Sequence, residues 1–246
     1  MINLISHKIP KGLWFMTQTW NDLLFAHWRV DPDIIRNKIP SCLDIDTYEG
    51  ISWVGIIPFE LTHLRARFLP PMPFAQSFPE LNLRTYVTHK WKPGVYFFSL
   101  DVEDHLAVFG ARTFFHLPYF YAQMVVVKKR EQIQYYSKRK DSKGPEVEFK
   151  ASYYPTSEPF LSKKGTLDYW LTERYRLYTT YKNQLYYEDI HHKPWLLQNA
   201  EAIIHRNTIA TPHKIALPQT KPLLHYAKRQ KVLFWPLKRS RYDSKL

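Results

Sequence analysis

The stretch Phe78-Pro79-Glu80-Leu81-Asn82-Leu83-Arg84-Thr85-Tyr86-Val87 alternates apolar and polar residues with the two-residue period of a β-strand. One face of such a strand presents Leu81, Leu83, Thr85 and Val87, and the other presents Glu80, Asn82, Arg84 and Tyr86. An acid, an amide, a guanidinium and a phenol on one strand face can bind a small anion or a carbonyl compound if that face lines a cavity. The alternative is an outer face exposed to water, which is common in antiparallel sheets.

The 246-residue chain is long enough for a sizeable core, and 45% of its residues are hydrophobic. It contains no internal repeat or low-complexity linker, so we expect a single domain over residues 1–246 with a frayed basic tail at about 237–246. Only 7 glycines are present, and neither GxGxxG nor GxxxxGKS/T occurs. We therefore expect no nucleotide cofactor, and no other cofactor is indicated.

Basic residues outnumber acidic ones by 35 to 22, which gives a net charge of +13. Such a charge attracts polyanions and small anions, and basic residues cluster at 128–130, 138–140 and along 221–245. A non-enzymatic protein that binds nucleic acid or another polyanion through these patches is therefore an alternative function. No RNP-like or helix-turn-helix motif supports specific nucleic-acid binding.

No apolar run approaches the ~20 residues of a membrane-spanning helix. Residues 1–16 show no signal-peptide cleavage site. We therefore expect no membrane insertion and a cytoplasmic protein.

Hairpin-linked strands dominate the rest of the chain. Strands are predicted at 19–30, 95–101, 147–153, 186–192 and 222–235, and hairpins at 43–47 with 51–57 and at 122–129 with 132–139. A long connection at 58–79 includes Pro70-Pro71-Met72-Pro73. Helices are predicted after Asp31, at 105–115 and at 165–178. An antiparallel sheet of this size tends to close on itself or to split into two layers.

Arg174 falls on the apolar stripe of the helix predicted at 165–178. A guanidinium there either reaches water along its alkyl stem or is buried with a partner. If Arg174 is buried, Glu80 is the first partner to test.

These residues carry a resemblance that extends over nearly the whole chain. The segments Trp20–Trp28, Phe78–Val87, Gly94–Leu100, Thr172–Tyr178 and His192–Trp195 together resemble the YqjF-like family of uncharacterised proteins. That family is similar to the acetoacetate decarboxylase-like superfamily. The resemblance implies a mainly β (α+β) fold, an antiparallel β-barrel or cone with a few packed helices and a small-molecule pocket inside.

The decarboxylases of that superfamily form a Schiff base on a lysine in a segment of the form Arg-Glu, a few residues, then Pro-Lys-Lys. The similar segment here is Arg112-Thr113-Phe114-Phe115-His116-Leu117-Pro118-Tyr119-Phe120. Arg112 and Pro118 match, but Tyr119 and Phe120 stand where the lysines would be. Because imine chemistry requires a primary amine, we expect no Schiff-base decarboxylation.

Three residues are candidates for catalysis, namely Glu80 as general acid or base, Tyr119 as a donor to an oxyanion, and Arg112. Ligand-binding candidates are Asn82, Arg84, Tyr86, Arg174 and Tyr178. The expected partner is a small molecule, a carboxylate or a carbonyl compound. The alternative is a structural network in which the glutamate pairs with arginines and does no chemistry.

Cys42 is the single cysteine, which excludes an intrachain disulfide and a cysteine-built zinc site. His191 and His192 are adjacent on a predicted strand and point to opposite faces, so no metal site is expected. The sequence leaves open the identity of the ligand, whether a reaction is catalysed, and whether the chain forms a homo-oligomer.

Overall fold

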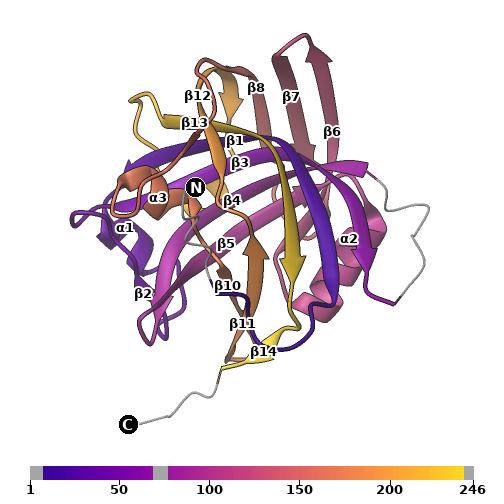
Figure 1. Ribbon diagram of the computed structural model, residues 1–246, viewed down its shortest axis with the longest axis vertical. Helices are drawn as coiled ribbons and strands as arrows, with labels where there is room; N and C mark the ends of the chain where they lie inside the picture. Colours follow the sequence, from indigo (N-terminus) through magenta and orange to yellow (C-terminus); the bar gives the residue numbers. More distant parts are fainter. Residues whose placement is uncertain (1–7, 69–76, 241–246) are drawn as a thin grey trace, which may run out of the picture.

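The computed structural model describes residues 8–68 and 77–240, and it is built mainly of β-strands with a few short helices (Figure 1). The strands are β1 Met16–Val30, β2 Asp44–Ile45, β3 Ser52–Ala66, β4 Ser77–His89, β5 Lys92–Val102, β6 Tyr119–Lys129, β7 Gln132–Arg139, β8 Glu148–Pro155, β9 Phe160–Leu161, β10 Arg176–Tyr181, β11 Gln184–His192, β12 Leu196–Asn207, β13 Leu223–Phe234 and β14 Lys238–Arg239. The helices are α1 Pro32–Arg36, α2 His105–Gly110 and α3 Leu167–Thr172, with a π-helical turn η1 at Ala111–Phe115 and a 3-10 turn η2 at Thr211–His213. The mainly β class expected from the sequence is confirmed.

The strands close into a cone through a ring of backbone pairings. The ring follows the order β1, β3, β4, β5, β10, β11, β13 and returns to β1. In Figure 1 the strands β1, β3, β4 and β5 lie side by side across the middle of the molecule. Most pairings are antiparallel, but β5 runs parallel to β6 and to β10. The sheet is therefore mixed, because α2 and η1 carry the chain over as a crossover between β5 and β6.

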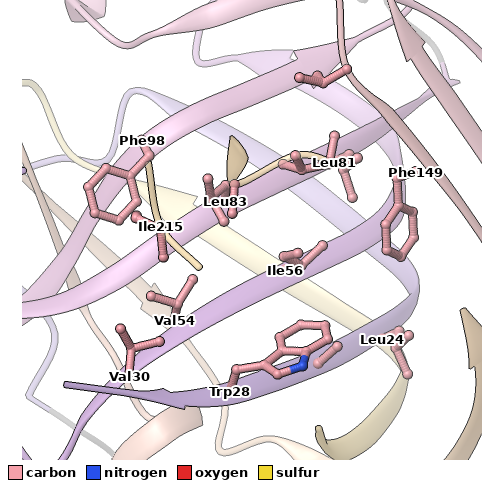
Figure 2. Packing of buried hydrophobic residues seen from close by; sticks show 14 of the residues in the cluster. Leu24, Trp28, Val30, Val54, Ile56, Leu81, Leu83, Phe98, Phe149 and Ile215 are labelled. Carbon is pink, nitrogen blue, oxygen red and sulfur yellow. The ribbon is translucent and has the colours of Figure 1, made fainter. Parts of the chain in front are cut away.

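The strand β4 is buried on both faces. Leu81 and Leu83 pack into the main apolar core with Ile56 of β3 and Phe98 of β5 (Figure 2). The strands β6, β7, β8 and β12 cover that core, since Met124, Tyr135 and Phe149 belong to the same cluster. The polar face of β4 points to the other side, into the cone. The alternative of a water-exposed outer face is therefore wrong.

Several local predictions are confirmed. The Asp31 carboxylate accepts a hydrogen bond from the Asp33 N–H at the start of α1. The hairpin of β6 and β7 and the helical stretch at 105–115 also appear. Among the described residues, no helix has the length and hydrophobicity needed to cross a membrane.

The prediction of a helix over residues 165–178 is wrong in its length. Thr166 caps α3 as expected, but the helix ends at Thr172 and the chain enters β10 at Arg176. The residues of β10 are mostly β-branched or aromatic, and pairing with β5 and β11 favours the extended form. Arg174 therefore lies in the link between α3 and β10, and its three- and four-residue spacing to the helix was coincidental.

The structure of residues 43–57 also differs from the hairpin predicted there. Strand β2 pairs with β4 and not with β3, and a single bridge between Tyr48 and Ile51 remains of the expected hairpin. Strand β3 continues to Ala66 and so takes up the first part of the connection predicted at 58–79. Pro58 is tolerated because it lies where the β1–β3 ladder is interrupted and no N–H is needed.

Two predicted segments extend beyond the described residues. Pro70–Pro73 lies outside them altogether. Of the tail predicted to fray, Lys238 and Arg239 form β14 against β11, whereas residues 241–246 lie outside the described part.

Candidate functional site

A cavity of about 600 Å³ lies inside the cone. Its walls come from the ring strands, from α2 and η1, and from Tyr119 at the start of β6. Most of the lining side chains are apolar or aromatic. The charged or hydrogen-bonding side chains on the wall are Gln18, Glu80, Asn82, Arg84, Asp104, Tyr119, Thr172, Arg174, Glu188 and His192. Glu80, Arg84 and Tyr119, which the sequence placed in one pocket, thus border the same cavity.

Glu80 is a buried carboxyl group that faces Tyr119. The Tyr119 hydroxyl lies 3.3 Å from both carboxyl oxygens of Glu80 and donates to them. Burial raises the pKa of Glu80 to about 8, although hydrogen bonds from Tyr119 and Asn82 act to lower it. Burial and the charge of Glu80 raise the pKa of Tyr119 well above its ordinary value. At neutral pH the pair is therefore a mostly protonated acid beside a phenol.

Glu188 is a second buried acid on the cavity wall, which the sequence analysis did not single out. Burial, followed by the neighbouring charge of Asp189, raises the pKa of Glu188 to about 8. Its Oε1 atom has no hydrogen-bond partner. Glu188, Ile190 and His192 all line the cavity from β11. Both faces of this strand mix polar and apolar residues, so no signal in the sequence pointed to Glu188.

Arg84 is a cation without an acidic partner among the described residues. Its Nη2 atom donates to the Tyr86 hydroxyl at 3.3 Å and to the Leu171 carbonyl at 3.4 Å. The guanidinium lies over the rings of Phe25 and Tyr86. Within residues 8–68 and 77–240, no carboxylate lies within 4.0 Å of it, and its buried Nε atom has no hydrogen-bond partner. Arg84 therefore offers an unneutralised charge to whatever occupies the cavity.

Arg174 is buried, with a side chain that is 5% exposed. Its partner is Asp46, which corrects the expectation of Glu80. The Nε atom donates to the Trp170 carbonyl at 2.6 Å, and the guanidinium stacks on the Trp170 and Tyr86 rings. Arg174 lines the cavity, but its charge is already neutralised.

Three predicted site residues do not line the cavity. Arg112 pairs with Asp141 at 2.8 Å and donates from Nε to the Tyr119 carbonyl at 2.7 Å, so it holds the backbone of Tyr119 from outside. Tyr178 donates to the Lys92 carbonyl at 2.9 Å. Tyr86 is fully buried behind Arg84, with its hydroxyl 2.6 Å from Nε2 of His27.

The expected alternative of a glutamate–arginine network is not what the described residues form. Arg112 pairs with Asp141 and Arg174 with Asp46, while Glu80 faces Tyr119. No lysine is among the described residues that line the cavity. In the part of the chain that the structure describes, no three His, Cys, Asp or Glu side chains are grouped to hold a metal ion.

Comparison with solved structures shows the fold. The chain superposes on acetoacetate decarboxylase from Legionella pneumophila with a TM-score of 0.63 at 13% identity, covering 97% of this chain and 94% of that one. The enduracididine biosynthesis enzyme MppR, complexed with pyruvate, gives a TM-score of 0.61 at 11% identity over 96% and 98% of the two chains. An acetoacetate decarboxylase-like enzyme from Sphingomonas wittichii RW1 gives 0.61 at 12% identity over 96% and 98%. The decarboxylase-like cone implied by the resemblance is confirmed.

Comparison of sequences shows the family. The chain is 64% identical over 232 residues to the uncharacterized protein YqjF of Bacillus subtilis (strain 168), which covers 94% of this chain and 95% of that protein. Residues 17–231 match the model of the DUF2071 family, described as an uncharacterized conserved protein. The chain therefore belongs to the DUF2071 family of YqjF-like proteins.

Proposed function

We propose that the cavity binds a small organic molecule that carries a carboxylate or a carbonyl group. The observation that carries this proposal is Arg84, a guanidinium on an apolar wall without a carboxylate partner among the described residues. Leaving a charge partly buried and unpaired is costly. A ligand carboxylate against Arg84 removes that cost and gains a charge-assisted hydrogen bond.

Glu80 and Tyr119 supply the chemistry if the ligand is transformed. A carboxylic acid with a pKa of about 8 gives up a proton near neutral pH and recovers it, which suits a general acid or base. The Tyr119 phenol can donate to a carbonyl oxygen as negative charge develops on it. Tyr119 and Phe120 at the lysine positions, and the absence of lysine from the described wall, argue against an imine intermediate.

The relatives in structure support a carbonyl acid as the first class of ligand to test. Their names include acetoacetate decarboxylase, and MppR was solved with pyruvate bound. At 11–13% identity these proteins share the fold with this chain, but they do not identify its ligand. The ligand therefore has to be found by a direct binding test.

The test is a thermal-shift and calorimetry panel of carboxylates and carbonyl compounds. It is run on the wild type, on Arg84→Met and on the control Arg206→Gln, which changes an arginine on β12 that does not line the cavity. We expect a ligand whose affinity falls about tenfold or more in Arg84→Met and is unchanged in Arg206→Gln. Failure of every compound to bind, or equal binding to all three proteins, contradicts the proposal. Salt-sensitive retention on heparin without any ligand then favours the polyanion-binding alternative.

A further inference from the structure

The cavity has a polar closed end and an apolar mouth. Along β4, Phe78, Glu80, Asn82 and Arg84 line it in succession. Six residues of strand span about 20 Å, so Phe78 and Arg84 mark two distant levels of the cavity. Beyond Arg84 the same strand face continues with Tyr86, which is fully buried together with the adjacent His27. The Arg84 end is therefore closed.

The mouth lies beside α2 and η1. Leu106, Phe109 and Phe114 line the cavity and yet are 61%, 65% and 68% exposed. Met16 and Ala66, which pair across β1 and β3, line the same cavity at the end of the strands opposite to Arg84. Three large apolar side chains exposed together are a feature of binding surfaces. Among the described residues, this end of the cavity is therefore bordered by an exposed apolar rim.

Between the two ends, the wall is largely aromatic and aliphatic. Trp20, Phe59, Leu61, Leu100, Trp195 and Phe234 contribute to it. The buried polar groups Glu80, Tyr119 and Glu188 on the wall are mostly neutral near pH 7 because burial raises each pKa. Arg174 is neutralised by Asp46. Of the two arginines on the wall, Arg84 is therefore the one without an acidic partner among the described residues, and its charge matches one negative charge.

On the basis of the proposed function, we infer that the ligand is an amphiphilic monocarboxylate whose carboxylate contacts Arg84 at the closed end and whose apolar tail extends to the rim at Phe109. The reverse orientation leaves Arg84 unpaired and places the carboxylate against Leu106 and Phe114. A short oxo acid can pair with Arg84, but it makes no contact with most of the apolar wall. A dicarboxylate brings a second charge for which the described wall has no free cation.

The experiment is isothermal titration calorimetry with butanoate, hexanoate, octanoate and decanoate below their micelle concentrations, and with octanamide and octanedioate. We expect one site, with affinity that rises about fourfold per added methylene while the tail stays inside the cavity. Octanamide and octanedioate should bind at least tenfold more weakly than octanoate. Arg84→Met should remove the preference for octanoate over octanamide and leave the chain-length dependence intact.

Two matched variants test the rim. Phe109→Asp should lower the affinity for decanoate more than the affinity for butanoate. The control Ile203→Asp changes an equally exposed apolar residue on β12 that does not line the cavity, and it should change neither affinity. Equal binding of butanoate and octanoate, or tighter binding of pyruvate or acetoacetate than of octanoate, overturns the inference and leaves the proposed function standing. Failure of all carboxylates and carbonyl compounds to bind overturns both. Several carboxylate molecules could also bind to each protein molecule with an affinity that Phe109→Asp does not change. That result would show non-specific adsorption and would also overturn the inference.

Discussion

The hydroxyl of Tyr119 lies 3.3 Å from each carboxyl oxygen of Glu80, at the position where the resemblance placed a decarboxylase lysine. The phenol donates to an acid whose pKa burial raises to about 8. A reaction that used this pair as an acid and a hydrogen-bond donor would not require a lysine amine. The arrangement keeps a titratable proton inside an apolar cavity, within hydrogen-bonding distance of a group that can share it.

The Glu80–Tyr119 contact should be measurable as a coupling energy. Tyr119→Phe and Glu80→Gln each change one partner, and we expect the double variant to differ from the sum of the single ones by about 1 kcal/mol. Urea unfolding of the wild type, the two single variants and the double variant at pH 6 gives the four free energies of the cycle. The control pair Tyr178→Phe with Glu80→Gln should be additive, because Tyr178 donates to the Lys92 carbonyl. Additivity of the Tyr119 pair would show that the contact does not contribute to stability.

Glu188 should make the protein less stable as the pH rises. Its folded pKa of about 8 lies above the ordinary value of 4.5, so between these pH values the folded state holds a proton that the unfolded state has lost. The free energy of unfolding therefore falls as the pH rises from about 4.5 to 8. Glu188→Gln keeps the shape and removes the titration. We expect this variant to melt higher than the wild type at pH 8 and to differ little at pH 4.5.

Glu103→Gln is the control for the Glu188 prediction, since Glu103 is an exposed glutamate on the loop before α2. Its melting temperature should follow the wild type at both pH values. A Glu188→Gln variant that melts below the wild type at pH 8 would mean that the carboxylate is stabilised by a contact in the folded state. That result would contradict the raised pKa.

The polar face of β4 was predictable because it depends on the pleat alone. Glu80, Asn82 and Arg84 alternate with apolar residues, and any extended conformation places them on one side. That Leu81 and Leu83 are buried as well depends on β6 to β8 folding over the other face, and no local pattern encodes that packing. The alternation also extends to Tyr86, but the cavity ends at Arg84.

The partners of the charged residues were not predictable from local sequence. Arg174 pairs with Asp46, which is 128 residues away in the chain, and Arg112 pairs with Asp141. Both pairs join segments that are separated in the sequence, by 29 residues for Arg112 and Asp141, so no local pattern indicates them. Glu188 was missed for a different reason. The strand around it was predicted, but its face was not assigned, because whether a strand borders a cavity or a core is set by the tertiary fold.

The absence of a lysine from the described wall leads to a chemical prediction. Incubation with pyruvate or acetoacetate and borohydride should leave the peptide that contains Tyr119 unmodified in the wild type. In Tyr119→Lys, the new amine lies in an apolar cavity, where burial lowers its pKa and favours imine formation. We expect a reduced adduct on that lysine, mapped by mass spectrometry. A stoichiometric adduct on any lysine of the wild type would contradict the expected absence of Schiff-base chemistry.

The Arg174–Asp46 ion pair should be costly to break on one side, because the remaining charge stays buried. Both side chains are largely buried, with 5% and 17% exposure, and the guanidinium lies between the Trp170 and Tyr86 rings. Asp46→Asn leaves a buried cation without a counter-charge, so we expect a loss of about 3–5 kcal/mol in urea unfolding. Changing Arg174→Met in addition removes that cation and should recover part of the loss. A cost below about 1 kcal/mol would contradict the prediction and would mean that the Arg174 charge does not depend on Asp46.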